Sequence, residues 1–173
     1  MPDAPMFDAP MLLVFPSLMA YAAFSDLFTM TISNWISILL VIAFVGVGLL
    51  AGMPVSTIGL HLACGFGVLV LTFSLFCFGW IGGGDAKLAA TTAVWMGVEH
   101  LAEYGMGSAL AGGALTLALL QFRRWPMPGW ARTRLWIMRL HDKDVGVPYG
   151  IALAAAGLAL YPETGVFVRV LGG

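Results

Sequence analysis

Asp26 and Asp85 are the residues of this sequence best suited to do chemistry. Each stands at the end of a long apolar segment, where an ionisable group costs about 3 kcal/mol and therefore indicates a functional site. Two carboxyl groups that share a site cannot both ionise cheaply, so one of them keeps a proton. Such a pair suits peptide hydrolysis, because one carboxylate can take a proton from water while the other hydrogen-bonds the scissile carbonyl. Spacing alone leaves a structural role or a proton relay open as alternatives.

The residues around Asp85 favour the catalytic interpretation. Three glycines, Gly82 to Gly84, precede it; they would let a bound peptide backbone approach closely and would permit dihedral angles closed to other residues. A flexible turn is the alternative. Asp85 could also cap the following helix, whereas Asp26, at the C-terminal end of its segment, is disfavoured there by the helix macrodipole. Within the coupled pair we therefore expect Asp85 to ionise more readily and Asp26 to hold the shared proton.

The composition shows that these aspartates belong to a membrane protein. Of 173 residues, 60% are hydrophobic and only 10% are charged, whereas a soluble domain has about 25% charged residues. The mean hydropathy of +0.93 agrees, and together these values exclude a soluble enzyme, a disordered tail and a disulfide-rich module. The formal net charge of −1 argues against a nucleic-acid partner. Cys64 and Cys77 lack Cys-x-x-Cys spacing, which favours buried packing residues over a metal site.

The apolar segments predict an all-α, polytopic fold with six transmembrane helices in one domain over residues 1–173. A span needs roughly 20 apolar residues, and residues 27–84 contain no charged side chain. That stretch is long enough for two spans, with a break at Gly52-Met53-Pro54. The other predicted spans are residues 11–26, 88–98, 104–122 and 145–162. Residues 88–98 are short for a crossing unless Asp85 and Lys87 lie in the first turn and reach the interface.

The basic residues predict the orientation of the chain. Six of the eight lie in the loop 123–144, namely Arg123, Arg124, Arg132, Arg134, Arg139 and Lys143. The positive-inside rule puts this loop in the cytoplasm, so six spans place the N-terminus outside and both aspartates on the cytoplasmic side. Arg169 is the one exception. The loop also contains Trp125, Trp130 and Trp136; this mixture favours contact with anionic lipid headgroups, with a substrate-leader contact as the alternative.

Three short motifs occur in order along the chain. Asp26 is followed after five residues by Ile32-Ser33-Asn34, residues 82–88 read Gly-Gly-Gly-Asp-Ala-Lys-Leu, and Pro148-Tyr149-Gly150 stands near the start of the last span. The second resembles the Gly-x-Gly-Asp-x-Lys-Leu motif of the type IV prepilin peptidases, aspartic proteases of the bacterial inner membrane. The first is similar to that family's aspartate followed by Ile-Pro-Asn, and the last to a third segment of the family. The resemblance therefore extends over nearly the whole chain.

The resemblance implies roles for six residues. It implies that Asp26 and Asp85 are the catalytic pair. It also implies that Gly82, Gly84, Lys87 and Asn34 belong to the motifs that the substrate approaches. No metal or organic cofactor is implied. Lys87 either supplies a positive charge near the pair or anchors its helix at the interface.

The chain also departs from the family pattern. Ser33 replaces the usual proline, which leaves the second span's start less rigidly fixed. Residues 27–31 lack the basic side chains common there. A cysteine-rich segment associated with N-methylation is missing, so the chain resembles the short branch that serves Flp (tad-type) pili.

We therefore expect a membrane aspartic endopeptidase that removes the leader from prepilins or pseudopilins at the cytoplasmic face of the inner membrane. Another Gly-x-Gly-Asp protease, such as a preflagellin peptidase or a presenilin-like enzyme, is one alternative. A small proton-coupled transporter subunit is another, although a relay would place its carboxylates near mid-membrane. Glu99, His100 and Glu103 suggest a metal site in an outer loop, but they lack a fourth ligand. The sequence predicts lipid contact and a prepilin partner, without an oligomeric state.

Overall fold

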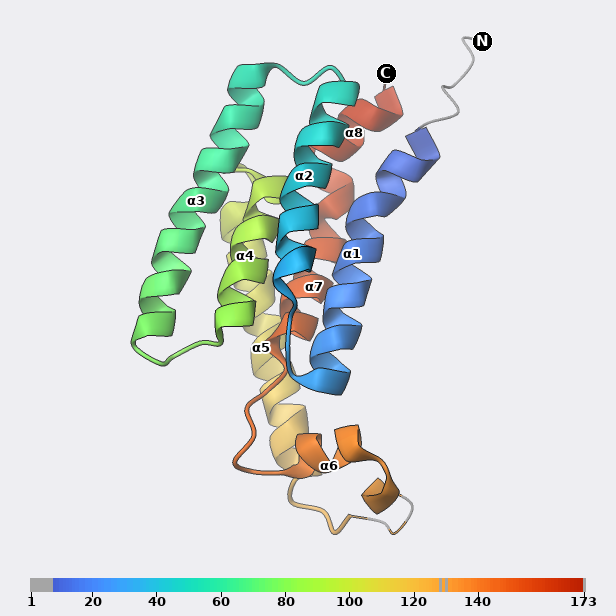
Figure 1. Cartoon of the computed structure of the whole chain (residues 1–173), viewed down its shortest axis with the longest axis vertical. Helices are drawn as coiled ribbons and strands as arrows, with labels where there is room; N and C mark the ends of the chain where they lie inside the picture. The colour runs from blue at the N-terminus through green and yellow to red at the C-terminus, as the bar shows by residue number, and fades with distance from the viewer. Residues whose placement is uncertain (1–7, 128, 130, 173) are drawn as a thin grey trace.

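The computed structural model describes residues 8–127, 129 and 131–172, and within them all regular secondary structure is helical (Figure 1). Trp130 of the basic loop lies outside the described residues. Two short 3-10 turns, η1 (Ala131–Thr133) and η2 (Tyr161–Glu163), accompany the α-helices. The helices are α1 (Asp8–Thr29), α2 (Asn34–Leu50), α3 (Val55–Cys77), α4 (Gly83–Met96), α5 (Leu101–Phe122), α6 (Leu135–His141), α7 (Tyr149–Leu160) and α8 (Gly165–Gly172).

Each of the six apolar segments forms a helix, which confirms the all-α prediction. The predicted break within residues 27–84 falls between α2 and α3. Gly52 adopts φ +67° there, a left-handed conformation that favours glycine, and Pro54 stands at the N-cap of α3. Local turn chemistry therefore accounts for the connection, which lies at the end of the bundle where α1 begins and α8 ends (Figure 1).

The helices differ in their capacity to cross a membrane. Three are long and apolar enough by themselves, namely residues Pro10–Thr29 of α1, α3 and α5, and a bent pair formed by α7 with η2 and α8 is a fourth candidate. α2 has 17 residues and α4 has 14, so α4 is about 21 Å long, against a hydrocarbon core of about 30 Å. Six spans and an outside N-terminus stay predictions.

The short helix α4 lies inside the bundle and forms much of its core. Nine of its 14 residues are buried, including the unbroken run from Ala90 to Met96. Trp95 is fully buried; its ring packs 4.9 Å from that of Phe15, and its indole N–H donates to the carbonyl of Leu40 at 3.0 Å. In contrast, α3 buries only Ile58 and Gly65. Most of the other side chains of α3 are apolar, as expected for a helix that faces lipid.

Gly65 marks the closest approach between α3 and α4. A Cβ atom there would clash with Val94 Cγ2 and would lie 2.9 Å from the Ala90 carbonyl oxygen. Small residues allow such close approach between membrane helices. We expect Gly65→Ala to lower the free energy of unfolding in detergent by about 1–3 kcal/mol, because the helices must separate. Gly67→Ala, where nothing lies within 4 Å, is the matched control. Equal thermal midpoints for both variants would show that this contact is not tight.

The basic loop folds against the end of the bundle where α1 finishes and α4 begins (Figure 1). Arg123 donates to the carbonyls of Leu140, Val145 and Gly146. On the other side of the loop, Arg139 Nη1 donates to the Phe28 carbonyl at 3.3 Å, and the rings of Trp136 and Phe28 meet edge to face. These contacts place α6 beside the turn that follows Asp26.

The prediction of two buried cysteines is wrong. Cys77 is exposed at the C-terminal end of α3, and Cys64 is half-buried in the same helix. The cause is the peripheral position of α3, which turns most of its residues outward. Apolar surroundings in the sequence do not distinguish a lipid-facing position from a core position.

Candidate active site

Asp26 is held near the C-terminal end of α1 by the start of another helix. Its side chain is 5% exposed, and its Oδ2 accepts a hydrogen bond of 2.7 Å from the backbone N–H of Gly150. Gly150 belongs to the first turn of α7, where backbone N–H groups lack helical partners and favour a negative charge. A buried carboxylate at this position is therefore stabilised by α7, 124 residues further along the chain.

Asp85 lies in the first turn of α4 and is half-buried. Its carboxylate accepts a hydrogen bond from the backbone N–H of Gly82, the N-cap residue. This is the reverse contact of a capping box, in which an acidic residue at the third helical position satisfies the N-cap N–H. The Asp26 and Asp85 carboxyl groups are close enough for their charges to interact. The fold therefore brings together the two aspartates that the sequence singled out.

The expectation that Asp26 holds the shared proton considered only the dipole of α1, whereas a second helix, α7, also acts on Asp26. Asp26 does lie at the C-terminal end of its own helix, as expected, but its carboxylate contacts the N-terminal turn of α7. Asp85 is at the N-terminal turn of α4. Both carboxyl groups thus receive a backbone N–H at a helix N-terminus, and helix dipoles no longer distinguish which of them holds the proton.

The glycines before Asp85 provide room, not unusual backbone angles. Gly82 has φ −71° and ψ 145°, which any residue adopts, and Gly83 and Gly84 are not among the described glycines with positive φ. The expectation that the triplet supplies dihedral angles closed to other residues is therefore wrong. A Cβ atom on Gly82 would lie 2.8 Å from Asp85 Oδ2, and one on Gly84 would lie 3.2 Å from Ile32 Cβ. The absence of side chains lets Asp85 and the first motif pack against the start of α4.

Lys87 and Asn34 join the two motifs directly. The Lys87 ammonium group donates to Asn34 Oδ1 at 2.7 Å, which links the first turn of α2 to α4. Both residues are exposed, so this end of the bundle presents a cation two residues beyond Asp85. The Ser33 side chain caps α2 by accepting from the Trp35 N–H at 3.4 Å. Serine in place of proline therefore still defines the start of this helix.

Sequence reasoning identified the segment that contains Gly150 but gave it no role. A Cβ atom at Gly150 would lie 2.8 Å from both Asp26 Oδ2 and Ile32 Cδ1. Ile32 also contacts the position of Gly84, so it packs between the starts of α4 and α7. The sequence signal for this role was a glycine in the first turn of an apolar helix. The fold alone shows that Asp26 is the partner of this glycine.

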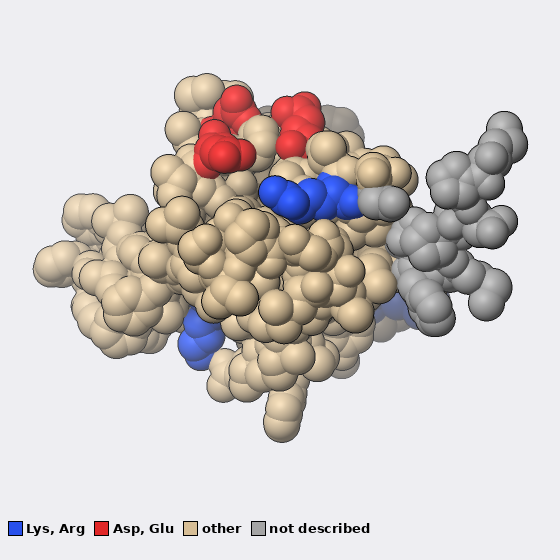
Figure 2. Space-filling view, turned by 90° about the horizontal axis from the view of Figure 1, so that it is seen from above, with Lys and Arg blue, Asp and Glu red and all other residues tan. Residues whose placement is uncertain are grey.

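A second cluster of titratable groups lies at the opposite end of the bundle. Donor atoms of His100, Glu103 and Glu163 all lie within 4.8 Å of one another, and Figure 2 shows acidic side chains gathered on this end of the molecule. His100 Nδ1 is 2.9 Å from Glu103 Oε2, and this hydrogen bond raises the pKa of the His100 imidazole. The ion pair accounts for the proximity of His100 and Glu103 without a metal, and the cluster is separate from the aspartates.

The described structure is thus a membrane helical bundle with two carboxyl groups near enough to interact electrostatically, each hydrogen-bonded at the N-terminal turn of a helix. Residues 13–117 match the model of the type IV leader peptidase family, and the chain belongs to that family. The match includes Asp26, Asn34 and the Gly82–Lys87 segment, and it ends before the basic loop. No curated protein and no solved structure matches the chain significantly.

Proposed function

We propose that the chain is an aspartic endopeptidase that removes the leader peptide from prepilins or pseudopilins. The observation that carries the proposal is the convergence of Asp26 and Asp85 at one end of the bundle, within a chain of the type IV leader peptidase family. The proposal includes assignment to the short Flp (tad-type) branch, which works without N-methylation. The reaction uses the protein's own side chains, without a metal or organic cofactor.

In the proposed reaction the two carboxyl groups hold one proton between them. The ionised group removes a proton from water, and the water oxygen attacks the scissile carbonyl carbon. The protonated group hydrogen-bonds the carbonyl oxygen and then protonates the leaving nitrogen as the C–N bond breaks. The products are a leader with a new carboxyl group and a pilin with a new amino group.

The proposed orientation puts the aspartates at the cytoplasmic face of the bacterial inner membrane, with six spans and the N-terminus outside. It is supported by the basic loop, which contacts the aspartate end of the bundle through the hydrogen bond from Arg139 to the Phe28 carbonyl. Lys87 lies at the same end, and cytoplasmic loops of membrane proteins carry an excess of such cations. A prepilin with a short cytoplasmic leader and one apolar helix would present its cleavage junction at this level.

Cys77 offers a test of this orientation. Its exposed thiol ends α3 at the level of the aspartates, whereas Cys64 is half-buried within the helix. We expect a membrane-impermeant maleimide to label inverted inner-membrane vesicles and not intact spheroplasts, and Cys77→Ser to remove the label. Labelling of spheroplasts through Cys77 would put the aspartates on the outer face and refute the orientation.

Co-expression tests the activity itself. The chain should be expressed with each small, leader-bearing apolar protein encoded nearby, and each product should be weighed by mass spectrometry. We expect one of them to lose its leader just ahead of the apolar segment. Purified protein in detergent should reproduce the cleavage, and reconstituted protein should show no proton-driven uptake. Proton-driven uptake without cleavage would favour the transporter alternative.

A further inference from the structure

We propose that Arg123 is a positioning residue for the candidate active site, because it fixes the segment that brings the Gly150 N–H to Asp26; this inference rests on the proposed function. Arg123 is the C-cap residue of α5 and is half-buried. It lies outside residues 13–117, which match the family model. Its hydrogen bonds go to backbone carbonyls and not to the aspartates, so its effect on the reaction passes through α7.

The Arg123 guanidinium joins the end of α6 to the segment that enters α7. Its Nε donates to the Leu140 carbonyl at 2.8 Å, and its Nη2 donates to the carbonyls of Val145 and Gly146 at 2.9 and 3.0 Å. Leu140 lies in the last turn of α6, where carbonyls lack helical partners and attract a cation. The planar guanidinium presents its donors in a fixed fork, so it holds both segments together. Since all three acceptors belong to the backbone, side-chain substitutions at their positions leave them in place.

The connection from Gly146 to Gly150 is short and constrained. Pro148, the N-cap residue of α7, is fully buried, and its ring fixes its own φ. The Tyr149 N–H donates to the Val147 carbonyl at 2.8 Å. A displacement at the Gly146 carbonyl is therefore transmitted over four residues to the hydrogen bond that Gly150 donates at the candidate active site.

The same loop also holds α1 close to Asp26. Arg139 of α6 donates to the carbonyl of Phe28, which lies two residues beyond Asp26 in the last turn of α1. Arg139 is followed directly by Leu140, whose carbonyl accepts from Arg123. Both partners of the hydrogen bond between α7 and Asp26 are therefore tied to α6, one through each arginine.

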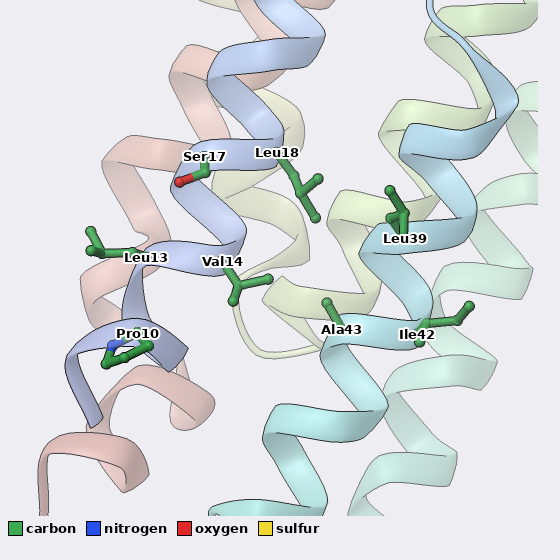
Figure 3. Close-up of a pocket in the computed structure, with 8 residues that line it drawn as sticks. All are labelled: Pro10, Leu13, Val14, Ser17, Leu18, Leu39, Ile42 and Ala43. Carbon is green, nitrogen blue, oxygen red and sulfur yellow. The ribbon is translucent and has the colours of Figure 1, made fainter. Parts of the chain in front are cut away.

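A surface groove between α1 and α2 shows why α1 depends on these contacts. The groove has a volume of about 450 Å³ along residues 10–18, and Val14 and Leu18 point toward α2 across it (Figure 3). Another face of α1 packs closely on α7, where a Cβ atom on Gly157 would lie 3.3 Å from Met19 Cε. The position of α1 therefore relies more on α7 and α6 than on α2.

Arg123→Lys tests this role without changing the charge of the basic loop. The variant keeps the cation, and with it any effect of charge on membrane orientation. A single ammonium group on a flexible stem does not reproduce the fork of a guanidinium, so the three carbonyls are no longer held together. Arg124→Lys is the matched control, because Arg124 is the next residue and its side chain is exposed.

Two readouts should change together in Arg123→Lys. With a prepilin peptide, kcat should fall about tenfold with little change in KM, because a displaced catalytic group loses transition-state stabilisation and not binding. In the full-length protein in detergent without substrate, the Gly150 amide should exchange its hydrogen faster, as measured by mass spectrometry on a fragment that covers the first turn of α7. Arg124→Lys should match the unmodified protein in both readouts, and exchange along α3 should stay the same in every variant.

Several outcomes would overturn the role of Arg123. They are a normal kcat in Arg123→Lys, a slow reaction with normal exchange at α7, and an equal loss in Arg124→Lys. Arg123→Gln undergoes the same two measurements and should show the same losses, so it decides the role if Arg123→Lys fails to fold. Failure of the unmodified protein to cleave any prepilin peptide would instead overturn the proposed function, and the exchange measurement would still show whether Arg123 holds the start of α7.

Discussion

Asp26→Asn and Asp85→Asn should each slow leader cleavage by at least about 10³-fold, within the range expected for loss of a general acid or base. Asparagine keeps the shape of the side chain, and its amide oxygen can still accept the Gly150 N–H at position 26 or the Gly82 N–H at position 85. The proton that the pair must share is lost in either variant. Initial rates with a purified prepilin peptide provide the measurement.

The double variant gives the sharper result. Because the two carboxyl groups act as one unit, Asp26→Asn combined with Asp85→Asn should be no slower than the slower single variant. Each variant should elute from size exclusion as the unmodified protein does, which excludes unfolding as the cause. Additive losses, or a single variant that retains more than a tenth of the normal rate, would contradict a shared catalytic role.

Gly150→Ala should reduce cleavage about 100-fold, although residue 150 has no side chain that could react. The added Cβ would lie 2.8 Å from Asp26 Oδ2 and 3.1 Å from Asp26 Cβ, so Asp26 must move away from the N-terminal turn of α7. A displacement of about 1 Å at a catalytic group costs about this much in rate. The effect should appear mainly in kcat, because Gly150 acts by positioning Asp26.

Gly146→Ala is the matched control for Gly150→Ala. Gly146 lies in the connection just before α7, and nothing lies within 4 Å of a Cβ atom there. We expect normal cleavage from this variant. A Gly150→Ala protein that cleaves at the normal rate would show that the contact between α7 and Asp26 does not matter for catalysis.

Much of the fold followed from local properties of the sequence. Uninterrupted apolar segments predicted the six main helices, and Gly52 and Pro54 predicted the break between α2 and α3. The bundle then brought Asp26 and Asp85 together, as their equivalent positions at the ends of spans suggested. Helix length was harder to predict. α4 is too short to span a bilayer by itself, and the neighbouring helices bury it.

The parts that could not be predicted depend on contacts between residues distant in sequence. The Gly150 N–H reaches Asp26 only after α7 packs against α1, and no local signal pairs those two residues. The dipole of α1 alone disfavours a charge on Asp26, whereas the N-terminal turn of α7 favours it. In the same way, the glycines before Asp85 suggested special dihedral angles, whereas Gly82 and Gly84 are needed for the space beside Asp85 and Ile32.

The most direct test of the account is the mass of a single-helix prepilin peptide after incubation with the purified protein. With the unmodified chain we predict two products, whose masses place the cut between the leader and the apolar helix. With Asp26→Asn or Asp85→Asn the peptide should keep its full mass over the same period. An uncut peptide with the unmodified chain, or the same two products from either variant, would contradict cleavage by the aspartate pair.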